Sequence, residues 1–114
     1  KSPSVSMLLE ETRKHRIPII GGSIPELCNG KVYNTAMAIS PESDLITKHR
    51  KMHLFDVNVP GGICFQESET LTAGDSFTVY HCSLPKTAVD IGIGVCYDMR
   101  FPELRFGSSL PTHL

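Results

Sequence analysis

Residues 91–104 read IGIGVCYDMRFPEL, and this stretch is the most informative part of the chain. Its first residues are those of a buried strand, and a helix is predicted from Met99 to Phe106. Cys96 lies at the changeover, where two rigid elements can hold a side chain toward a pocket. By position alone Cys96 is therefore either a small core residue or a candidate nucleophile.

The composition excludes several function classes. The chain has 114 residues, enough for one domain or part of one, with 40% apolar residues, 20% charged residues and a net charge of -1. A net charge this close to zero does not indicate a basic surface for binding nucleic acid or an anionic membrane. No apolar run approaches the roughly 18 residues of a membrane span, and no signal-peptide core follows Lys1. Because no initiator methionine is present, we expect further residues upstream.

The four cysteines indicate the compartment. They are widely and unevenly spaced, with no Cys-x-x-Cys pair, so neither a structural zinc site nor a disulfide framework is predicted. Reduced thiols favour an intracellular location. We expect the cytoplasm and leave an organelle open.

The pattern of apolar and turn residues predicts a mixed α/β chain with a meander of antiparallel strands. A helix is expected over residues 3–16, with Ser2 as its cap and Pro3 in its first turn. Asn29-Gly30 indicates a hairpin. The predicted strands cover residues 19–24, 32–39, 45–52, 76–83 and 87–96. Residues 54–75 are interpreted as one long loop, a feature that is usually functional, and residues 107–114 as an atypical, disordered tail.

Two further residues have chemistry that would suit a thiol nucleophile. Lys51 ends the third predicted strand, and its ammonium could lower the pKa of a thiol or stabilise an oxyanion, with the backbone N–H of Tyr97 as a second donor. The alternative is that residues 48–53 form a solvated basic face. Glu67, in the long loop, could orient the lysine or bind a water, and the alternative is a surface acid.

The remaining polar residues leave more than one interpretation. Asp98 and Arg100 could pair with each other or hold the loop, and Arg100 could also meet an acidic substrate. The histidines show no metal spacing and are interpreted as structural or surface residues. They are His15, His49, His53, His81 and His113.

Several motifs in order resemble the nitrilase superfamily of carbon–nitrogen hydrolases, most closely its omega-amidase branch. They are GGSIPE at 21–26, YNTA at 33–36, KHRKMHLFD at 48–56, FQES at 65–68 and GVCYDMRF at 94–101. The resemblance extends over roughly residues 3–106. It implies an α-β-β-α sandwich, of which this chain resembles about the middle third to half.

The resemblance also implies residue roles. Cys96 falls on the family's nucleophile, Lys51 on its lysine and Glu67 on its second glutamate, while Tyr97 and Arg100 would meet the oxyanion or substrate. The implied reaction releases ammonia from amides such as 2-oxoglutaramate or 2-oxosuccinamate through a cysteine thioester. It requires no metal or organic cofactor, and the partners implied are a small-molecule amide and, in an intact relative, further copies of the same chain.

The chain departs from the family pattern in one important respect. The family's glutamate base lies on a strand before the first helix, and no residue here takes that place. Glu26 imitates the Pro-Glu pair but belongs to the later GGSIPE motif. We therefore expect residues 1–106 to be a partial hydrolase domain, a fragment that is inactive in its 114-residue form. The alternatives are a non-enzymatic interaction protein or truncated subunit of the same fold, and a carbamoylase, aliphatic amidase or nitrilase.

Overall fold

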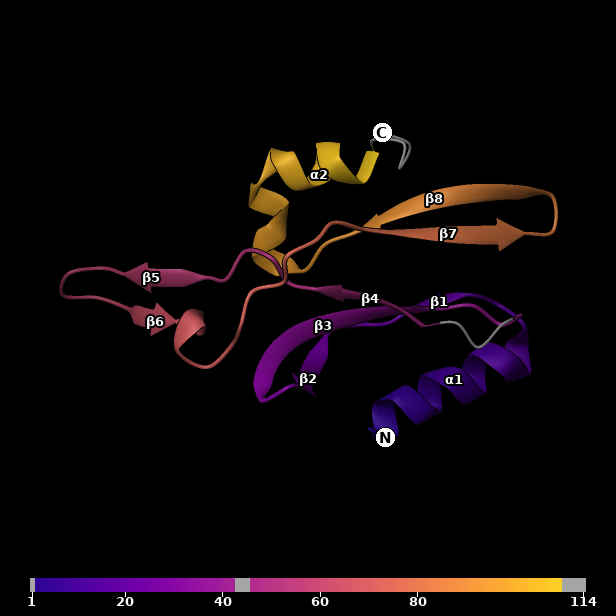
Figure 1. The fold of residues 1–114 in the computed structure, drawn as a ribbon, viewed down its shortest axis with the longest axis horizontal. Coiled ribbons are helices and arrows are strands. Elements are labelled where there is room, and N and C mark those ends of the chain that lie inside the picture. The colour runs from indigo at the N-terminus through magenta and orange to yellow at the C-terminus, as the bar shows by residue number, and fades with distance from the viewer. Residues whose placement is uncertain (1, 43–45, 110–114) are drawn as a thin grey trace.

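The computed structural model describes residues 2–42 and 46–109, and its elements follow one another with short connections (Figure 1). The α-helices of this described part are α1 (Pro3–His15) and α2 (Pro102–Ser109), and its short 3-10 helices are η1 (Glu67–Glu69) and η2 (Cys96–Arg100). The strands are β1 (Ile19–Ile20), β2 (Ile24–Cys28), β3 (Lys31–Ile39), β4 (Ile46–Arg50), β5 (Asp56–Asn58), β6 (Cys64–Gln66), β7 (Thr78–Leu84) and β8 (Thr87–Ile93).

The described elements stack in four layers, in the order α1, the β1–β4 sheet, the β7–β8 hairpin and α2 (Figure 1). Strand β3 is the centre of the first sheet: β4 pairs with one edge, and β1 and β2 pair in succession with the other, all antiparallel. A core joins this sheet to the hairpin. Its buried members are Ala36, Ala38, Tyr80, Cys82, Ile93 and Val95. The predicted α-β-β-α layering and antiparallel meander are therefore confirmed.

Helix α1 packs on the outer side of the sheet, with Leu9 and Thr12 buried. A Cβ at Gly21 would lie 2.8 Å from Leu8 Cδ1, so glycine allows the helix to approach the sheet closely. Ser2 lies at the N-cap position, as predicted. Its side chain makes no capping hydrogen bond, and its carbonyl instead accepts one from the Ser6 N–H.

The predicted strand over residues 19–24 is wrong in its extent, because it divides into β1 and β2 around residues 21–23. The Asn29-Gly30 hairpin is confirmed. Both residues have positive φ, 50° and 74°, as a two-residue turn of this kind requires. The third strand is shorter than the expected 45–52, and Leu45 lies outside the described residues.

The predicted long loop over residues 54–75 is wrong, because it contains the β5–β6 hairpin and η1. Pro60, Gly61 and Gly62 lie in the turn between these two paired strands, where Gly61 has a φ of 71°. The hairpin projects away from the four layers (Figure 1). Strands of three residues are too short for an alternating pattern to reveal them.

The end of the chain also differs in detail. Strand β8 stops at Ile93, Cys96 begins η2, and the helix starts at Pro102 rather than at Met99. Helix α2 includes residues 107–109 of the predicted tail; residues 110–114 lie outside the described part, so the division at residue 106 stays a prediction. None of the helices within 2–42 and 46–109 is long and apolar enough to cross a membrane.

Candidate active site

The candidate site begins with strand β4, whose side chains alternate between two environments. His49 and Lys51 are 0% and 2% exposed, and they bind Thr78 of β7 and Glu67 of η1 respectively. Lys48 and Arg50 point the opposite way, where both bind Glu26. This alternation is the ordinary period of a strand. The interpretation of residues 48–53 as one solvated basic face is therefore wrong for Lys51.

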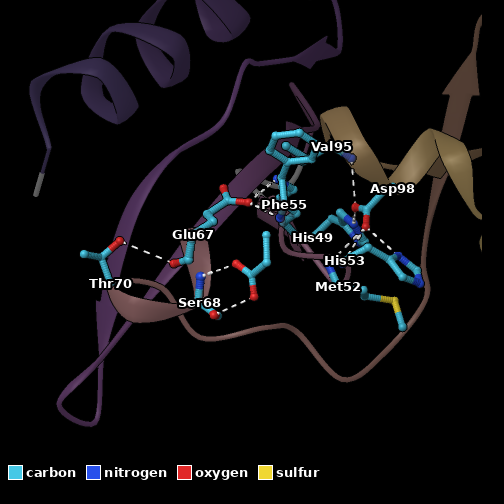
Figure 2. Close-up of polar contacts among 11 residues, drawn as sticks. His49, Met52, His53, Phe55, Glu67, Ser68, Thr70, Val95 and Asp98 are labelled. Atoms are coloured by element: carbon cyan, nitrogen blue, oxygen red, sulfur yellow. Dashed lines mark hydrogen bonds and ion pairs between the residues drawn. The ribbon is translucent and has the colours of Figure 1, made fainter. Parts of the chain in front are cut away.

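Lys51 and Glu67 form a nearly dry ion pair. Lys51 Nζ donates to Glu67 Oε2 over 2.5 Å, and the same oxygen accepts the backbone N–H of Phe55 at 2.7 Å. The Glu67 N–H donates in return to the Phe55 carbonyl at 3.2 Å. Figure 2 shows Glu67 reaching from η1 toward Phe55. The structure thus brings Glu67 beside Lys51, as predicted, and anchors it to the start of the β5–β6 hairpin.

Cys96 occupies a strained tight turn. Its φ is 51°, a left-handed conformation that costs a non-glycine residue about 1–2 kcal/mol. The Asp98 N–H donates to the Val95 carbonyl at 3.1 Å and closes the turn over Cys96 and Tyr97. The thiol is free and exposed, whereas that of Cys82 is buried in the core. The interpretation of Cys96 as a small core residue is therefore wrong.

Asp98 is fully buried, and its carboxylate accepts five hydrogen bonds (Figure 2). The donors are the N–H groups of Met52, His53 and Val95 and one ring nitrogen each of His49 and His53. Burial raises the pKa of Asp98, but these hydrogen bonds outweigh it and hold the pKa below its ordinary value of 3.8. The Asp98–Arg100 pair that we considered is not formed, and Asp98 holds the loop instead.

The Asp98 carboxylate joins the two halves of the candidate site. Met52 and His53 follow Lys51 directly, and Val95 directly precedes Cys96. One side chain therefore binds the main chain beside the lysine and the main chain beside the thiol. The sequence did not reveal this role, because the two segments lie more than 40 residues apart and no local pattern pairs them.

Aromatic side chains surround the same turn. The Tyr97 ring makes edge contacts with Phe55, at a centroid distance of 5.1 Å, and with Phe101, at 5.2 Å. The His53 ring stacks on Phe101 at 3.7 Å. These contacts pack the turn against the start of the β5–β6 hairpin. Arg100 is exposed on η2.

The histidines are structural or surface residues where the structure describes them, as predicted. His49 bridges Asp98 and the Thr78 hydroxyl, His53 binds Asp98, and His15 and His81 pair with exposed acids. His113 lies outside the described residues. Within 2–42 and 46–109, no cluster of three or more histidine, cysteine, aspartate or glutamate side chains is arranged to hold a metal ion.

Comparison with known proteins places this geometry in a family. The family model described as carbon–nitrogen hydrolase matches residues 1–111. This chain belongs to the carbon–nitrogen hydrolase family. The match includes Lys51, Glu67 and Cys96, and the predicted resemblance to the nitrilase superfamily is confirmed.

Individual carbon–nitrogen hydrolases are similar over most of the chain. Omega-amidase NIT2-B of Xenopus laevis is 52% identical over 101 residues, which are 89% of this chain and 35% of that protein. The chloroplastic omega-amidase of Arabidopsis thaliana is 48% identical over 103 residues, 90% of this chain and 27% of the relative. The chain thus spans about a third of the length of the curated relatives it matches.

A solved structure of the same superfamily has a similar fold. The Saccharomyces cerevisiae Nit3 structure, of branch 10 of the nitrilase superfamily, superposes with a TM-score of 0.76 at 40% identity, covering 95% of this chain and 35% of Nit3. The likeness over nearly the whole chain supports the layered arrangement that positions the site.

Proposed function

We propose that this chain carries the nucleophile, the lysine and the second glutamate of an omega-amidase-like hydrolase. The observation that carries the proposal is an exposed thiol on a strained turn, fastened through Asp98 to the chain beside a buried Lys51–Glu67 pair. Strained residues that the surrounding structure holds in place cluster at active sites. The omega-amidase relatives of about 50% identity support this class of reaction.

The proposed reaction proceeds through a thioester. The Cys96 sulfur attacks the amide carbon as its proton passes to a base from outside residues 1–114, and that proton is then given to the departing nitrogen as the C–N bond breaks, which releases ammonia. Water next attacks the thioester carbonyl, which yields the carboxylic acid and regenerates the thiol. In both steps negative charge develops on the carbonyl oxygen, where the Lys51 ammonium and the Tyr97 N–H stabilise it.

Glu67 has two tasks in this scheme. Its contacts with Lys51 and with the Phe55 N–H hold the ammonium in one place, so that little reorganisation is needed when charge develops. Its carboxylate is also the ion-pair partner of the buried lysine side chain. The family's thiol base falls on no residue of this chain, so the complete cycle requires a glutamate from outside residues 1–114.

The substrate class that we propose is a short amide with an acidic group, such as 2-oxoglutaramate. Arg100 is exposed four residues after the thiol and supplies a guanidinium for a substrate carboxylate. The aromatic side chains of Phe55 and Tyr97 flank the turn and suit the short carbon chain between the two ends of such a substrate.

The test is ammonia release from 2-oxoglutaramate by the longest natural polypeptide that contains residues 1–114. We expect turnover that is lost in Cys96→Ala and kept in Cys64→Ala, because Cys64 is also exposed but lies on β6. Mass spectrometry of the quenched enzyme should find the acyl group on Cys96. Turnover of only carbamoyl amino acids or nitriles would overturn the substrate class, and activity in Cys96→Ala would overturn the nucleophile.

A further inference from the structure

The two oxygens of the buried Asp98 carboxylate accept hydrogen bonds from two different segments of the chain. We propose that Asp98 is a positioning residue, which fixes the Cys96 turn and the end of β4 at Lys51 in a single catalytic geometry. The proposal deepens the proposed function and rests on it for the roles of Cys96 and Lys51.

The first carboxylate oxygen binds the chain that follows Lys51. Oδ1 accepts the Met52 N–H at 3.2 Å, the His53 N–H at 2.9 Å and the His53 Nδ1–H at 2.8 Å. Two backbone groups and one side chain therefore determine the path of the main chain directly after the lysine. Lys51 itself is held from the other side, since its N–H donates to the Asn34 carbonyl on β3 at 2.8 Å.

The second oxygen binds the turn that presents the thiol. Oδ2 accepts the Val95 N–H at 3.0 Å and the His49 Nε2–H at 3.0 Å. The Val95 contact, together with the reverse bond from the Asp98 N–H to the Val95 carbonyl, encloses Cys96 and Tyr97. This closure offsets the cost of the left-handed Cys96 backbone.

His49 extends the connection to the second sheet. It lies on β4 two residues before Lys51, and its Nδ1 is 3.1 Å from the Thr78 hydroxyl on β7. The network thus includes β4, β7 and the Cys96 turn, and the His49 and Asp98 side chains at its centre are both 0% exposed. A charged group that joins three elements in a dry interior restricts their relative movement.

Only an ionised carboxylate matches this set of partners. All five groups donate, and asparagine would turn one acceptor oxygen into an NH₂ donor. If the NH₂ took the place of Oδ2, the Val95 N–H would have no acceptor. If it took the place of Oδ1, the backbone N–H groups of Met52 and His53 would have none. Asp98→Asn is nearly equal in size, so its effect reports hydrogen bonding rather than volume.

The experiment compares alkylation of Cys96 with that of Cys64 in the same molecule, using iodoacetamide at neutral pH. In Asp98→Asn we expect the Cys96:Cys64 rate ratio to fall about 10-fold and kcat for 2-oxoglutaramate to fall about 100-fold, with KM within about threefold of the original. The matched control is Asp90→Asn, an exposed aspartate on β8 that pairs with His81. It should leave the ratio and both constants unchanged.

His53→Phe keeps the test decisive if Asp98→Asn does not fold. Phenylalanine can retain the stack on Phe101 but removes one donor to Oδ1, so we expect an intermediate loss in the ratio of about threefold and a loss in kcat with KM kept. A folded variant of either kind with an unchanged ratio and an unchanged kcat would overturn the positioning role.

The two proposals fail separately. If the unaltered protein releases no ammonia but the alkylation ratio still falls in Asp98→Asn, then the substrate assignment fails and the positioning role stands. If the unaltered protein turns over 2-oxoglutaramate and the folded variants keep its ratio and kcat, then the function stands and the positioning role fails.

Discussion

The two faces of strand β4 hold carboxylates of different kinds. On the outer face, Glu26 binds only side chains: Lys48 Nζ at 2.9 Å, Arg50 Nε at 3.1 Å and the Thr35 hydroxyl at 2.7 Å. On the inner face, Asp98 and Glu67 bind backbone N–H groups as well as side chains. Side-chain partners can move without moving the chain, whereas backbone partners cannot. The outer cluster therefore stabilises the fold, and the inner one determines geometry.

The sharpest test of this contrast replaces one lysine from each face. Lys51→Met should reduce ammonia release about 100- to 1,000-fold, because it removes the donor that we propose for the oxyanion. Lys48→Met should leave activity unchanged and cost less than about 1 kcal/mol, because its side chain is 52% exposed. Steady-state kinetics and urea unfolding check both. Equal loss of activity in the two variants would remove the distinction between the faces.

The next test concerns the close contact between Gly74 and the end of strand β4. A Cβ at Gly74 would lie 2.2 Å from the Arg50 carbonyl oxygen, and the Gly74 N–H donates to the Lys51 carbonyl at 2.8 Å. Gly74→Ala should therefore lower the free energy of unfolding by about 1–3 kcal/mol and weaken activity. Gly22→Ala is the control, since a Cβ there meets no atom within 4 Å. Urea denaturation that finds the two variants equally stable would contradict this packing.

The outer cluster around Glu26 should make the stability of the fold depend on pH. The Arg50 guanidinium, with Lys48 and Thr35, holds the pKa of Glu26 at about 2, against an ordinary value of 4.5 and despite burial, which raises it. A lowered folded-state pKa contributes stability above pH 4.5 that is lost as the pH falls toward 2. Glu26→Gln should cost about 1.5 kcal/mol at pH 7 and flatten the stability profile between pH 4.5 and 2, with activity kept. Thermal unfolding across this range is the measurement, and an unchanged slope would contradict it.

The smallest expected effect separates backbone strain from thiol chemistry. Cys96→Gly and Cys96→Ala both remove the nucleophile, but only glycine adopts a φ of 51° without strain. Cys96→Gly should therefore be more stable than Cys96→Ala by up to about 1 kcal/mol. Chemical denaturation resolves this difference. A less stable glycine variant would show that the turn stores no strain.

Local patterns were sufficient for some elements and insufficient for others. Helix α1 and the Asn29-Gly30 turn depend on residues close in sequence, and both are confirmed. The strand-to-helix change near Cys96 is also local, but the strand ends at Ile93 and the α-helix begins only at Pro102. The β5–β6 hairpin was missed because its strands have three residues each. The placement of Lys51, Glu67 and Cys96 came from motif resemblance, and their catalytic roles stay predictions. The Asp98 network depends on partners 45 to 49 residues away, which no local period encodes.

The alternation along β4 determines which kinds of mutation this region can tolerate. A substitution at Lys48 or Arg50 alters contacts of the outer face, among them those with Glu26 and, for Arg50, also that with the Tyr33 ring. Deletion of a single residue within Ile46–Arg50 would exchange the two faces, and would place the side chain of Lys51 on the outer face and that of Arg50 on the inner face. Homologous chains should therefore keep the length of this strand constant.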